Sequence, residues 1–493
     1  MPPPIHLVPV VREIPADLET PVSAYLKLAD AGARFLLESV ELGENLGRYS
    51  FIGAGARERI AARGGRAFFA SARGIETRPL PTSRALSIVR DRLRRYRIQP
   101  HPLVPRLLGG AVGFVAYDYV RTLERIPDRH PDPPDLPLFD FVLADTLVVF
   151  DHVKRKMLLV ALDAVGDRHG ERPSAARRIE ALARALHRPL PPSVARPPRA
   201  RPAPRFVSNT DQADYEAAVR AAKTHIRAGD IFQAVLSHRR SGTIHADPFL
   251  VYRALRILNP SPYMFYFDFP PLRGAVDQPW QLVGSSPEVH AKLERGVASI
   301  RPIAGTRPRG ADAAEDEALR RELLANEKER AEHVMLIDLA RNDLGRCCAF
   351  GSVRVTDLMV VEKYSHVQHI VSEVTGALAR DRDAFDLFDA TFPAGTVSGA
   401  PKVRAMEIID ALERARRGPY AGTVGYFGLG GEMDMAIAIR TAVIRREARG
   451  RRVAHLQAGA GIVADSRPAA EWRETINKMA ALERAVAMAE AGF

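Results

Sequence analysis

VAHLQAGAGIVAD, residues 453–465, is typical of a buried β-strand, and the run directly after it predicts a helix over residues 468–491. Asp465 or Ser466 can cap this helix, and Pro468 fits its first turn. This stretch therefore predicts a β-strand followed by a helix.

Strands and helices occur in blocks along the chain instead of alternating. Helix patterns cover residues 211–228, 314–342 and 398–417, while β-rich runs begin at residues 281, 297, 353, 421 and 433. Blocks of this kind favour an α+β fold over a doubly wound one. We therefore expect large antiparallel β-sheets flanked by helices.

The composition is that of an ordinary globular protein. Of the 493 residues, 46% are hydrophobic and 26% are charged, which excludes wholesale disorder. No apolar stretch reaches the roughly 18 residues of a membrane span, and the first residues lack the pattern of a signal peptide. The two cysteines, Cys347 and Cys348, are adjacent and cannot form a disulfide framework, which fits a cytoplasmic location.

The net charge of +12 raises the possibility of nucleic-acid binding. Most of the excess lies in two arginine-rich runs, residues 84–97 and 188–205, so the remainder of the chain is nearly neutral. We therefore expect no nucleic-acid partner. A basic nucleic-acid-binding protein stays the alternative from a different functional class. The second run belongs to a segment rich in Pro and Arg, residues 187–206, which predicts a linker between an N-terminal domain, 1–186, and a catalytic domain, 207–493.

Two Glu-x-x-Glu pairs are the strongest chemical signal. Glu329 and Glu332 lie one turn apart on one predicted helix, and Glu471 and Glu474 do so on another. Each pair alone is commonly a solvated face. If both pairs meet in a cleft, the four carboxylates need a counter-cation, and hard oxygen ligands favour Mg²⁺ over zinc.

Two further patterns carry weaker signals. In FPAGTVSGAPKV, residues 392–403, a glycine-rich turn passes Thr396 and leads into a predicted helix whose free N–H groups suit an anion. A capped helix start with no ligand explains the same pattern equally well. His369 is a candidate acid or base, although a lone histidine is more often structural.

Taken together, the order and wording of these motifs resemble those of the chorismate-utilising enzymes. The resemblance covers the chain from about residue 211 to the C-terminus, and the N-terminal region more loosely. It implies that family's α+β fold with a β-sandwich-like core. The motifs that carry it are RPIAGT (301–306), NEKERAEHVMLIDLARNDLGR (326–346), YSHVQHIVSEV (364–374), FPAGTVSGAPKVRAMEIID (392–410), GPYAGTVGYFG (418–428), AIAIR (436–440) and AGAGIVADSRPAAEWRETINK (458–478).

Two positions distinguish branches within this family. Gln233 stands where isochorismate and salicylate synthases carry a lysine that activates water, and Ala304 stands where the typical aminodeoxychorismate synthase carries a nucleophilic lysine. The resemblance therefore favours the large subunits of anthranilate synthase, which convert chorismate and ammonia to anthranilate and pyruvate in the first step of tryptophan biosynthesis. The aminodeoxychorismate synthase large subunit stays the alternative, since some of its members lack the lysine.

The resemblance also implies roles for single residues. Glu332 and Glu474 would hold Mg²⁺, with Glu329 and Glu471 supporting it directly or through water, and the metal would act as a Lewis acid on the ring carboxylate. The positions implied for catalysis are His369, Thr396 and Gln233. Those implied for chorismate are Gly305, Thr306, Tyr420, Arg440, Gly459, Ala460, Gly461 and Lys478.

The resemblance also implies an inhibitor site and a partner subunit. LLES (36–39) and NPSPYM (259–264) resemble the tryptophan feedback site of anthranilate synthases, which would place L-tryptophan against Glu38, Ser39, Pro262, Tyr263 and Met264. Cys347 and Cys348 lack the glycine-flanked turn of an amidotransferase nucleophile. The resemblance therefore implies a hetero-oligomer in which a separate glutamine amidotransferase subunit supplies the ammonia.

Overall fold

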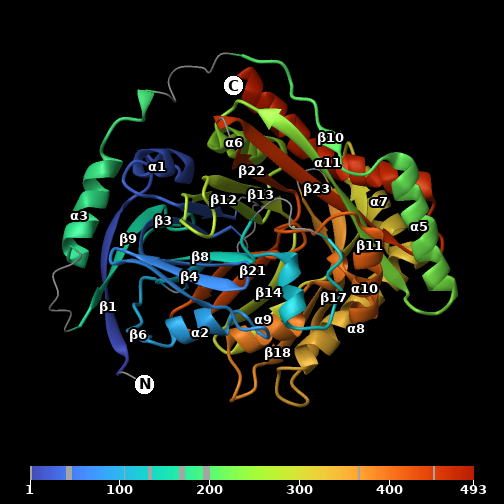
Figure 1. The fold of residues 1–493 in the computed structure, drawn as a ribbon, viewed down its shortest axis with the longest axis horizontal. Coiled ribbons are helices and arrows are strands. Elements are labelled where there is room, and N and C mark those ends of the chain that lie inside the picture. The colour runs from blue at the N-terminus through green and yellow to red at the C-terminus, as the bar shows by residue number, and fades with distance from the viewer. Residues whose placement is uncertain are drawn as a thin grey trace.

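The computed structural model describes residues 3–39, 47–104, 106–130, 136–165, 173–192, 200–364, 367–447 and 450–493. The strands join into one continuous sheet that folds over itself into two facing layers (Figure 1). Apart from the short parallel pairing of β1 with β6, the strand pairings are antiparallel. The expected α+β fold with large antiparallel sheets is therefore confirmed.

The first layer is built mainly from the C-terminal half of the chain. Its strands, in spatial order, are β10 (Val207–Ser208), β11 (Gln233–Ile244), β23 (Arg452–Ile462), β22 (Thr441–Arg446), β13 (Trp280–Ser286), β12 (Tyr263–Phe269), β2 (Phe35–Glu38) and β3 (Tyr49–Arg63). The short strand β19 (Gly399–Ala400) adds to β11, and the hairpin of β4 (Arg66–Ser71) and β5 (Gly74–Pro79) extends β3.

The second layer continues from β3. Its strands are β8 (Phe139–Asp151), β7 (Gly110–Val115), β20 (Thr423–Gly428), β21 (Met433–Ile437), β14 (Val289–Glu294), β15 (Val297–Ile300) and β18 (Val367–Ala377), with β16 (Ile303–Pro308) and β17 (Arg354–Lys363) paired to β18. Along the same edge of β8, beyond its pairing with β7, follow β9 (Lys156–Ala164), β1 (Ile5–Pro15) and β6 (Tyr96–Ile98).

Aromatic side chains fill the space between the two layers. Phe114 of β7 meets Trp280 of β13 edge to face with 5.2 Å between ring centroids, and Phe269 of β12 stacks on the same indole at 4.4 Å. These rings are at most 1% exposed. Aromatic rings contribute large apolar areas to a core, so this interface accounts for the sandwich-like packing.

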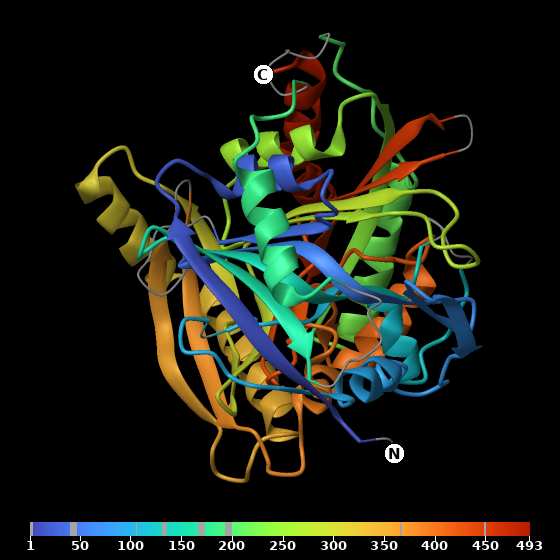
Figure 2. The same ribbon diagram turned by 90° about the vertical axis from the view of Figure 1, so that its left-hand side faces the viewer.

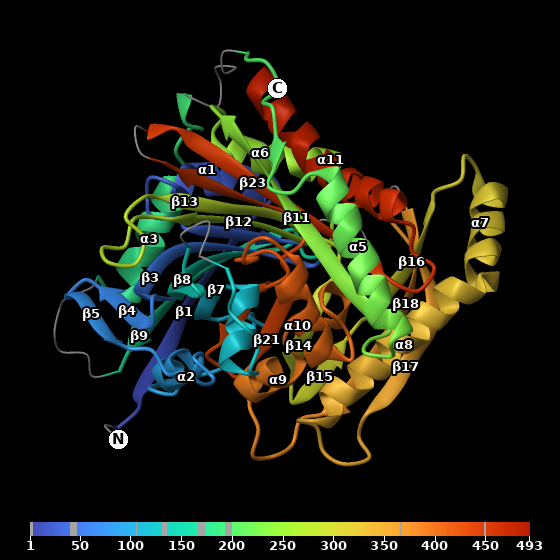
Figure 3. The same ribbon diagram turned by 45° about the vertical axis from the view of Figure 1, so that its right-hand side comes forward.

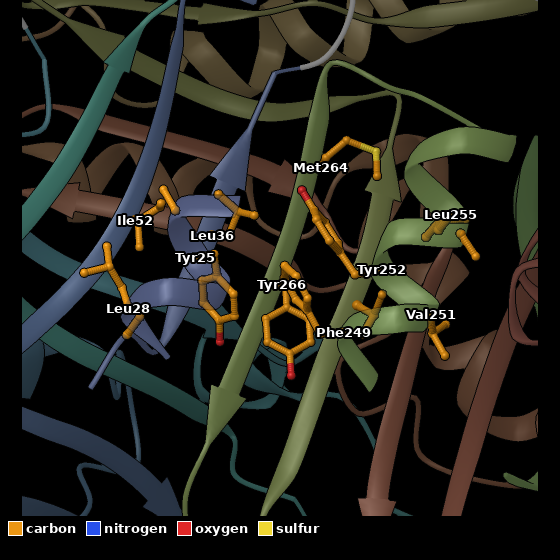
Figure 4. Packing of buried hydrophobic residues seen from close by; sticks show 14 of the residues in the cluster. Tyr25, Leu28, Leu36, Ile52, Phe249, Val251, Tyr252, Leu255, Met264 and Tyr266 are labelled. Carbon is orange, nitrogen blue, oxygen red and sulfur yellow. The ribbon is translucent and has the colours of Figure 1, made fainter. Parts of the chain in front are cut away.

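Helices cover both outer faces of the sandwich (Figures 1 and 2). On the first layer lie α1 (Pro21–Leu28), α6 (Pro248–Leu258) and α11 (Pro468–Ala491), and Figure 4 shows how Tyr252 of α6 packs beside Tyr266 of β12. Helix α3 (Ala175–Leu186) lies beside α1 and packs against β9 and β1. On the second lie α2 (Ser87–Leu93), the 3-10 turn η1 (Tyr117–Thr122), α8 (Glu327–Gly345) and α9 (Ala384–Thr391). Beside β11 lie α5 (Gln212–Arg227) and α10 (Lys402–Leu412), and α7 (Ala313–Ala325) projects from the body (Figure 3).

The two halves of the sequence share these layers. Strand β2 pairs with β12 through Glu38 and Met264, and β7 pairs with β20 through Val112 and Tyr426. The division at residues 187–206 stays a prediction about the sequence, and residues 193–199 of that segment lie outside the described residues. No helix in the described part of the chain combines the length and apolar character needed to cross a membrane.

Two helix predictions are corrected by the structure. The single helix expected over 314–342 is divided into α7 and α8 at Asn326, whose extended backbone lets its side chain accept from the Glu329 N–H and cap α8. The helix expected over 398–417 is shorter, because residues 399 and 400 pair with β11 as β19 and the helix begins only at Lys402.

Candidate active site

One cavity of about 630 Å³ opens between β11 and β23 on one side and β16, β18 and α8 on the other. A volume of this size suits a small-molecule substrate. The structure brings together in it Gln233, Gly305, Thr306, Glu329, Glu332, His369, Thr396, Tyr420, Arg440, Gly459, Gly461, Glu471, Glu474 and Lys478. These are the positions predicted for catalysis, substrate and metal, with one exception.

The exception is Ala460. It is fully buried and packs in the cluster beneath α5 and α10, together with Ile409. Successive residues of a strand face opposite sides, so the two glycines that flank Ala460 on β23 face the cavity while its own side chain faces the core.

The acidic end of the cavity lies between α8 and α11. Burial, followed by the charge of Glu329, raises the pKa of Glu332, and burial also raises the pKa of Glu471 with a contribution from Glu474. Glu329 contacts Arg307 at 3.2 Å, and Glu474 contacts Lys478 at 2.7 Å. Carboxylates that raise one another's pKa are destabilised as anions, so a cation between α8 and α11 would relieve them.

The four carboxylates would hold a magnesium ion only together with oxygen ligands from elsewhere. Within the described ranges, no three Asp, Glu, His or Cys side chains are close enough to enclose an ion by themselves. Magnesium commonly takes only one or two protein carboxylates and fills its other positions with water and substrate oxygens. The donor set is therefore suited to an ion that is completed by a bound carboxylate.

The cationic end of the cavity is formed by Arg440 and Lys478. Burial lowers the pKa of the Arg440 guanidinium, and its Nη1 donates to the Lys478 carbonyl at 3.0 Å. Arg440 also has a φ of +50°, a left-handed conformation that costs a non-glycine residue energy and often marks a functional site. The Lys478 ammonium donates to the Gly459 carbonyl at 3.0 Å.

Glycines keep the cavity open where larger residues would close it. A Cβ on Gly461 would lie 2.6 Å from the Gln233 amide nitrogen, and one on Gly459 would lie 2.8 Å from the Tyr420 hydroxyl. Gly305 has a φ of +65°, which side chains rarely allow. At these three positions the backbone can therefore approach a ligand directly.

His369 is held by two oxygen atoms of β16. Its Nδ1 lies 2.9 Å from the Gly305 carbonyl and 3.1 Å from the Thr306 hydroxyl. A carbonyl can only accept, so Nδ1 carries the proton and Nε2 is left as an acceptor. Burial lowers the pKa of His369, so the ring is neutral at pH 7 and able to take up a proton.

Glu288 is a cavity residue that the sequence analysis missed. It lies in the turn between β13 and β14 and is 8% exposed, and burial raises its pKa from the ordinary 4.5 to about 8. At pH 7 it is therefore a neutral carboxylic acid that can donate a proton. A signal was present in SSPE, residues 285–288, where an acidic residue lies two positions after the end of a buried strand.

A second cavity of about 530 Å³ lies where β2 meets β12. It is lined by the residues predicted to hold an inhibitor, namely Glu38, Ser39, Pro262, Tyr263 and Met264. The Ser39 hydroxyl is buried and has no hydrogen-bond partner among the described residues. The Glu38 carboxylate is bonded to Tyr252 and, at 3.1 Å, to Arg256 of α6. Tyr252 reaches from α6 toward Met264 in Figure 4.

The amino-acid sequence is similar to those of known proteins. The sequence pattern of the family described as chorismate binding enzyme matches residues 32–484. Anthranilate synthase component 1 from Acinetobacter calcoaceticus is 45% identical over 99% of this chain and 97% of its own. That from Thermus thermophilus is 48% identical over 97% of both chains.

The chain belongs to the anthranilate synthase component 1 family of chorismate-binding enzymes.

Solved structures support the same assignment. Anthranilate synthase component I from Streptococcus pneumoniae is 36% identical and covers 90% of this chain and 94% of its own, with a TM-score of 0.76. The menaquinone-specific isochorismate synthase from Escherichia coli is 20% identical, with a TM-score of 0.69 over 99% of this chain and 96% of its own. That second likeness shows a common fold.

Proposed function

We propose that this protein is the large subunit of an anthranilate synthase, which converts chorismate and ammonia to anthranilate and pyruvate. The observation that carries the proposal is the pairing of Gln233 and Glu288 in one cavity. Gln233 is an amide at the position where other branches of the family carry a water-activating lysine. Glu288 is a carboxylic acid that is neutral at pH 7. The names of the full-length relatives support the same reaction.

Gln233 suits a nucleophile that needs no base. Its amide oxygen is buried and has no hydrogen-bond partner among the described residues. Ammonia carries its own lone pair and three N–H groups, so one N–H can donate to this oxygen while the lone pair attacks C2 of chorismate. Water would have to lose a proton during attack, and an amide cannot take it.

Glu288 is suited to assist the departure of the C4 hydroxyl. As the new C2–N bond forms, the two ring double bonds shift to C6–C1 and C4–C5, the C4–O bond breaks and the Glu288 proton passes to the leaving oxygen, which departs as water. The new ammonium nitrogen then releases one proton, which restores the Glu288 acid. His369 then accepts the proton from C2 while the C3–O bond breaks and enolpyruvate leaves. The ring becomes aromatic, and enolpyruvate takes up a proton to become pyruvate.

The remaining cavity residues bind and orient the substrate. Arg440 and Tyr420 would grip the enolpyruvyl carboxylate, where a planar guanidinium allows two parallel hydrogen bonds. Glu332 and Glu474 would hold Mg²⁺, with Glu329 and Glu471 in support. Bound there, the ion supplies positive charge to the ring carboxylate and so favours both steps.

The proposal includes an inhibitor site and a partner subunit. The second cavity presents basic and acidic side chains, among them Arg48, Lys292 and Asp434, together with the free Ser39 hydroxyl. These groups match the carboxylate and amine of an amino acid, which supports L-tryptophan as its ligand. The designation component 1 of the relatives supports a partner component, which we propose to be a glutamine amidotransferase that releases the ammonia.

A product assay tests the proposal. The purified chain is incubated with chorismate, Mg²⁺ and an ammonium salt at pH 8, where some free ammonia is present. We expect a fluorescent product with the spectrum of anthranilate and an equal amount of pyruvate. Aminodeoxychorismate without pyruvate would identify the folate-type reaction, and isochorismate formed without ammonia would show that water is the nucleophile.

A further inference from the structure

A buried ion pair lies directly behind the wall of the catalytic cavity. Arg417 and Glu413 are four residues apart, just after α10, and their side chains are only 1% and 6% exposed. Arg417 Nε donates to Glu413 Oε2 at 3.0 Å, and Nη2 donates to Oε1 at 2.6 Å. Neither residue lines the cavity, so the pair does not itself contact substrate.

The remaining hydrogen bonds of this pair go to segments that do line the cavity. Arg417 Nη1 donates to the Val397 carbonyl and Nη2 to the Val235 carbonyl, each at 2.6 Å. Glu413 Oε1 accepts from both the N–H and the hydroxyl of Ser237 at 2.8 Å. The pair thereby ties strand β11, which carries Gln233, to the turn that carries Thr396.

Ring contacts and one further hydrogen bond extend the connection. The Arg417 guanidinium lies 5.7 Å from the centroid of the Tyr420 ring and 4.5 Å from that of Tyr117, which comes from the N-terminal half. The Ser237 hydroxyl, held by Glu413, accepts from the amide of Gln457 at 2.9 Å, and Gln457 lines the cavity. Two charged side chains thus touch three segments of the wall and reach a fourth through Ser237.

The electrostatics of the pair indicate that its role is to orient neighbouring groups, because its net contribution to stability is small. Burial works against the charge of Arg417, but the Glu413 carboxylate outweighs it, and the pKa of Arg417 is raised. A buried pair of this kind can often be replaced by apolar residues without loss of stability, because desolvation offsets most of the attraction. What apolar residues cannot reproduce is the set of directed bonds to Val235, Val397 and Ser237.

We propose that Glu413 and Arg417 are positioning residues of the chorismate site, which set the relative placement of Tyr420, Gln457 and the Thr396 turn. The inference rests on the proposed function for the identity of its substrate. It predicts that a small change in the pair displaces groups that grip the substrate while the fold survives. Displacements of about 1 Å can lower the rate about 10²-fold.

A matched control exists elsewhere in the chain. Arg59 and Asp140 form a second buried bidentate pair, with contacts of 2.8 and 2.6 Å and side chains 9% and 0% exposed. Arg59 also lies over an aromatic ring, that of Phe269, at 5.4 Å. This pair lies in β3 and β8, and neither member lines the catalytic cavity.

The test compares Arg417→Lys and Glu413→Gln with Arg59→Lys and Asp140→Asn in the full chain. We expect the first two to raise KM for chorismate at least tenfold and to lower kcat/KM about 10²-fold, while the other two stay within about twofold of wild type after correction for the folded fraction. Destabilisation alone lowers the active fraction and leaves KM unchanged. An unchanged KM in folded Arg417→Lys, or equal losses in both pairs, would overturn the inference.

A double variant and a direct binding measurement complete the test. The double variant Glu413→Leu with Arg417→Met restores an apolar fit, so it should fold yet bind chorismate weakly; if it keeps the wild-type KM, the inference is wrong. Calorimetric titration of each variant with chorismate and Mg²⁺ measures affinity without reference to a product. If wild type makes no anthranilate, the proposed function fails, while these affinities still decide the role of the pair.

Discussion

Replacement of Glu288 by Gln should lower activity and raise stability at the same time. The residue is buried and has a pKa of about 8, whereas an unfolded chain would give it the ordinary 4.5. At pH 7 the folded protein holds the neutral acid while the unfolded chain ionises, and this difference favours unfolding. Glutamine has nearly the same shape and cannot ionise, so it removes this disadvantage.

The magnitude follows from the two pKa values. A raised pKa destabilises the folded state progressively as the pH rises from 4.5 to about 8. At about 1.4 kcal/mol per unit, the cost at pH 7 is about 3 kcal/mol. The gain in stability of Glu288→Gln should therefore be absent at pH 4, about 3 kcal/mol at pH 7, and largest above pH 8.

Activity should change in the opposite direction. Loss of a general acid lowers kcat about 10² to 10⁴-fold. In wild type, kcat/KM for chorismate at a fixed concentration of free ammonia should fall above pH 8 as Glu288 loses its proton, and Glu288→Gln should lack this limb. The exposed Glu180, paired with Arg12 at the surface, supplies the control, since Glu180→Gln should alter neither property.

Urea unfolding monitored by circular dichroism at pH 4, 7 and 9, together with pH–rate profiles, measures both effects. A destabilised or pH-independent Glu288→Gln would show that this carboxyl is ionised in the native state. Wild-type kcat in this variant would remove Glu288 from the chemistry.

Three further predictions concern the other parts of the site. Glu332→Gln should raise the Mg²⁺ concentration needed for half-maximal activity at least tenfold, as measured by titration after chelation, because one of few carboxylate ligands is lost; an unchanged requirement would place the ion elsewhere. Arg440→Lys should raise KM for chorismate about tenfold or more, since an ammonium cannot form the bidentate contact, and a KM within twofold of wild type would argue against this grip. Ser39→Ala should leave the rate without tryptophan unchanged but raise the half-inhibitory tryptophan concentration about fivefold, the effect of one hydrogen bond; full sensitivity would contradict the assignment of the second cavity.

The sequence was sufficient where residues repeat at the period of an element. Spacing of three residues placed Glu329 with Glu332, and Glu471 with Glu474, on single helix faces, and the structure brings both pairs to one cavity. The fold class could be predicted because the strands occur in blocks. Family motifs supplied the grouping of Arg440 with Tyr420, which no local pattern indicates.

Other features depend on tertiary surroundings. Glu288 is a single acidic residue at a turn, and only burial on all sides makes it an acid at pH 7. Glu413 and Arg417 have the spacing of an ordinary surface ion pair, and nothing local shows that they are enclosed. Asn326 divides a continuous helical pattern because its side chain caps α8, a choice that helix propensity alone does not make.

The pairing of β2 with β12 and of β7 with β20 has a consequence for how the chain is made. On one edge of their strands residue 36 pairs with residue 266, and residue 112 with residue 426. Contacts of such long range slow folding, and a growing chain exposes unpaired strand edges until they form. An emerging polypeptide therefore cannot complete either layer before nearly the whole sequence has left the ribosome. Truncations well before residue 428 should be insoluble, and production should benefit from slow synthesis or from chaperones.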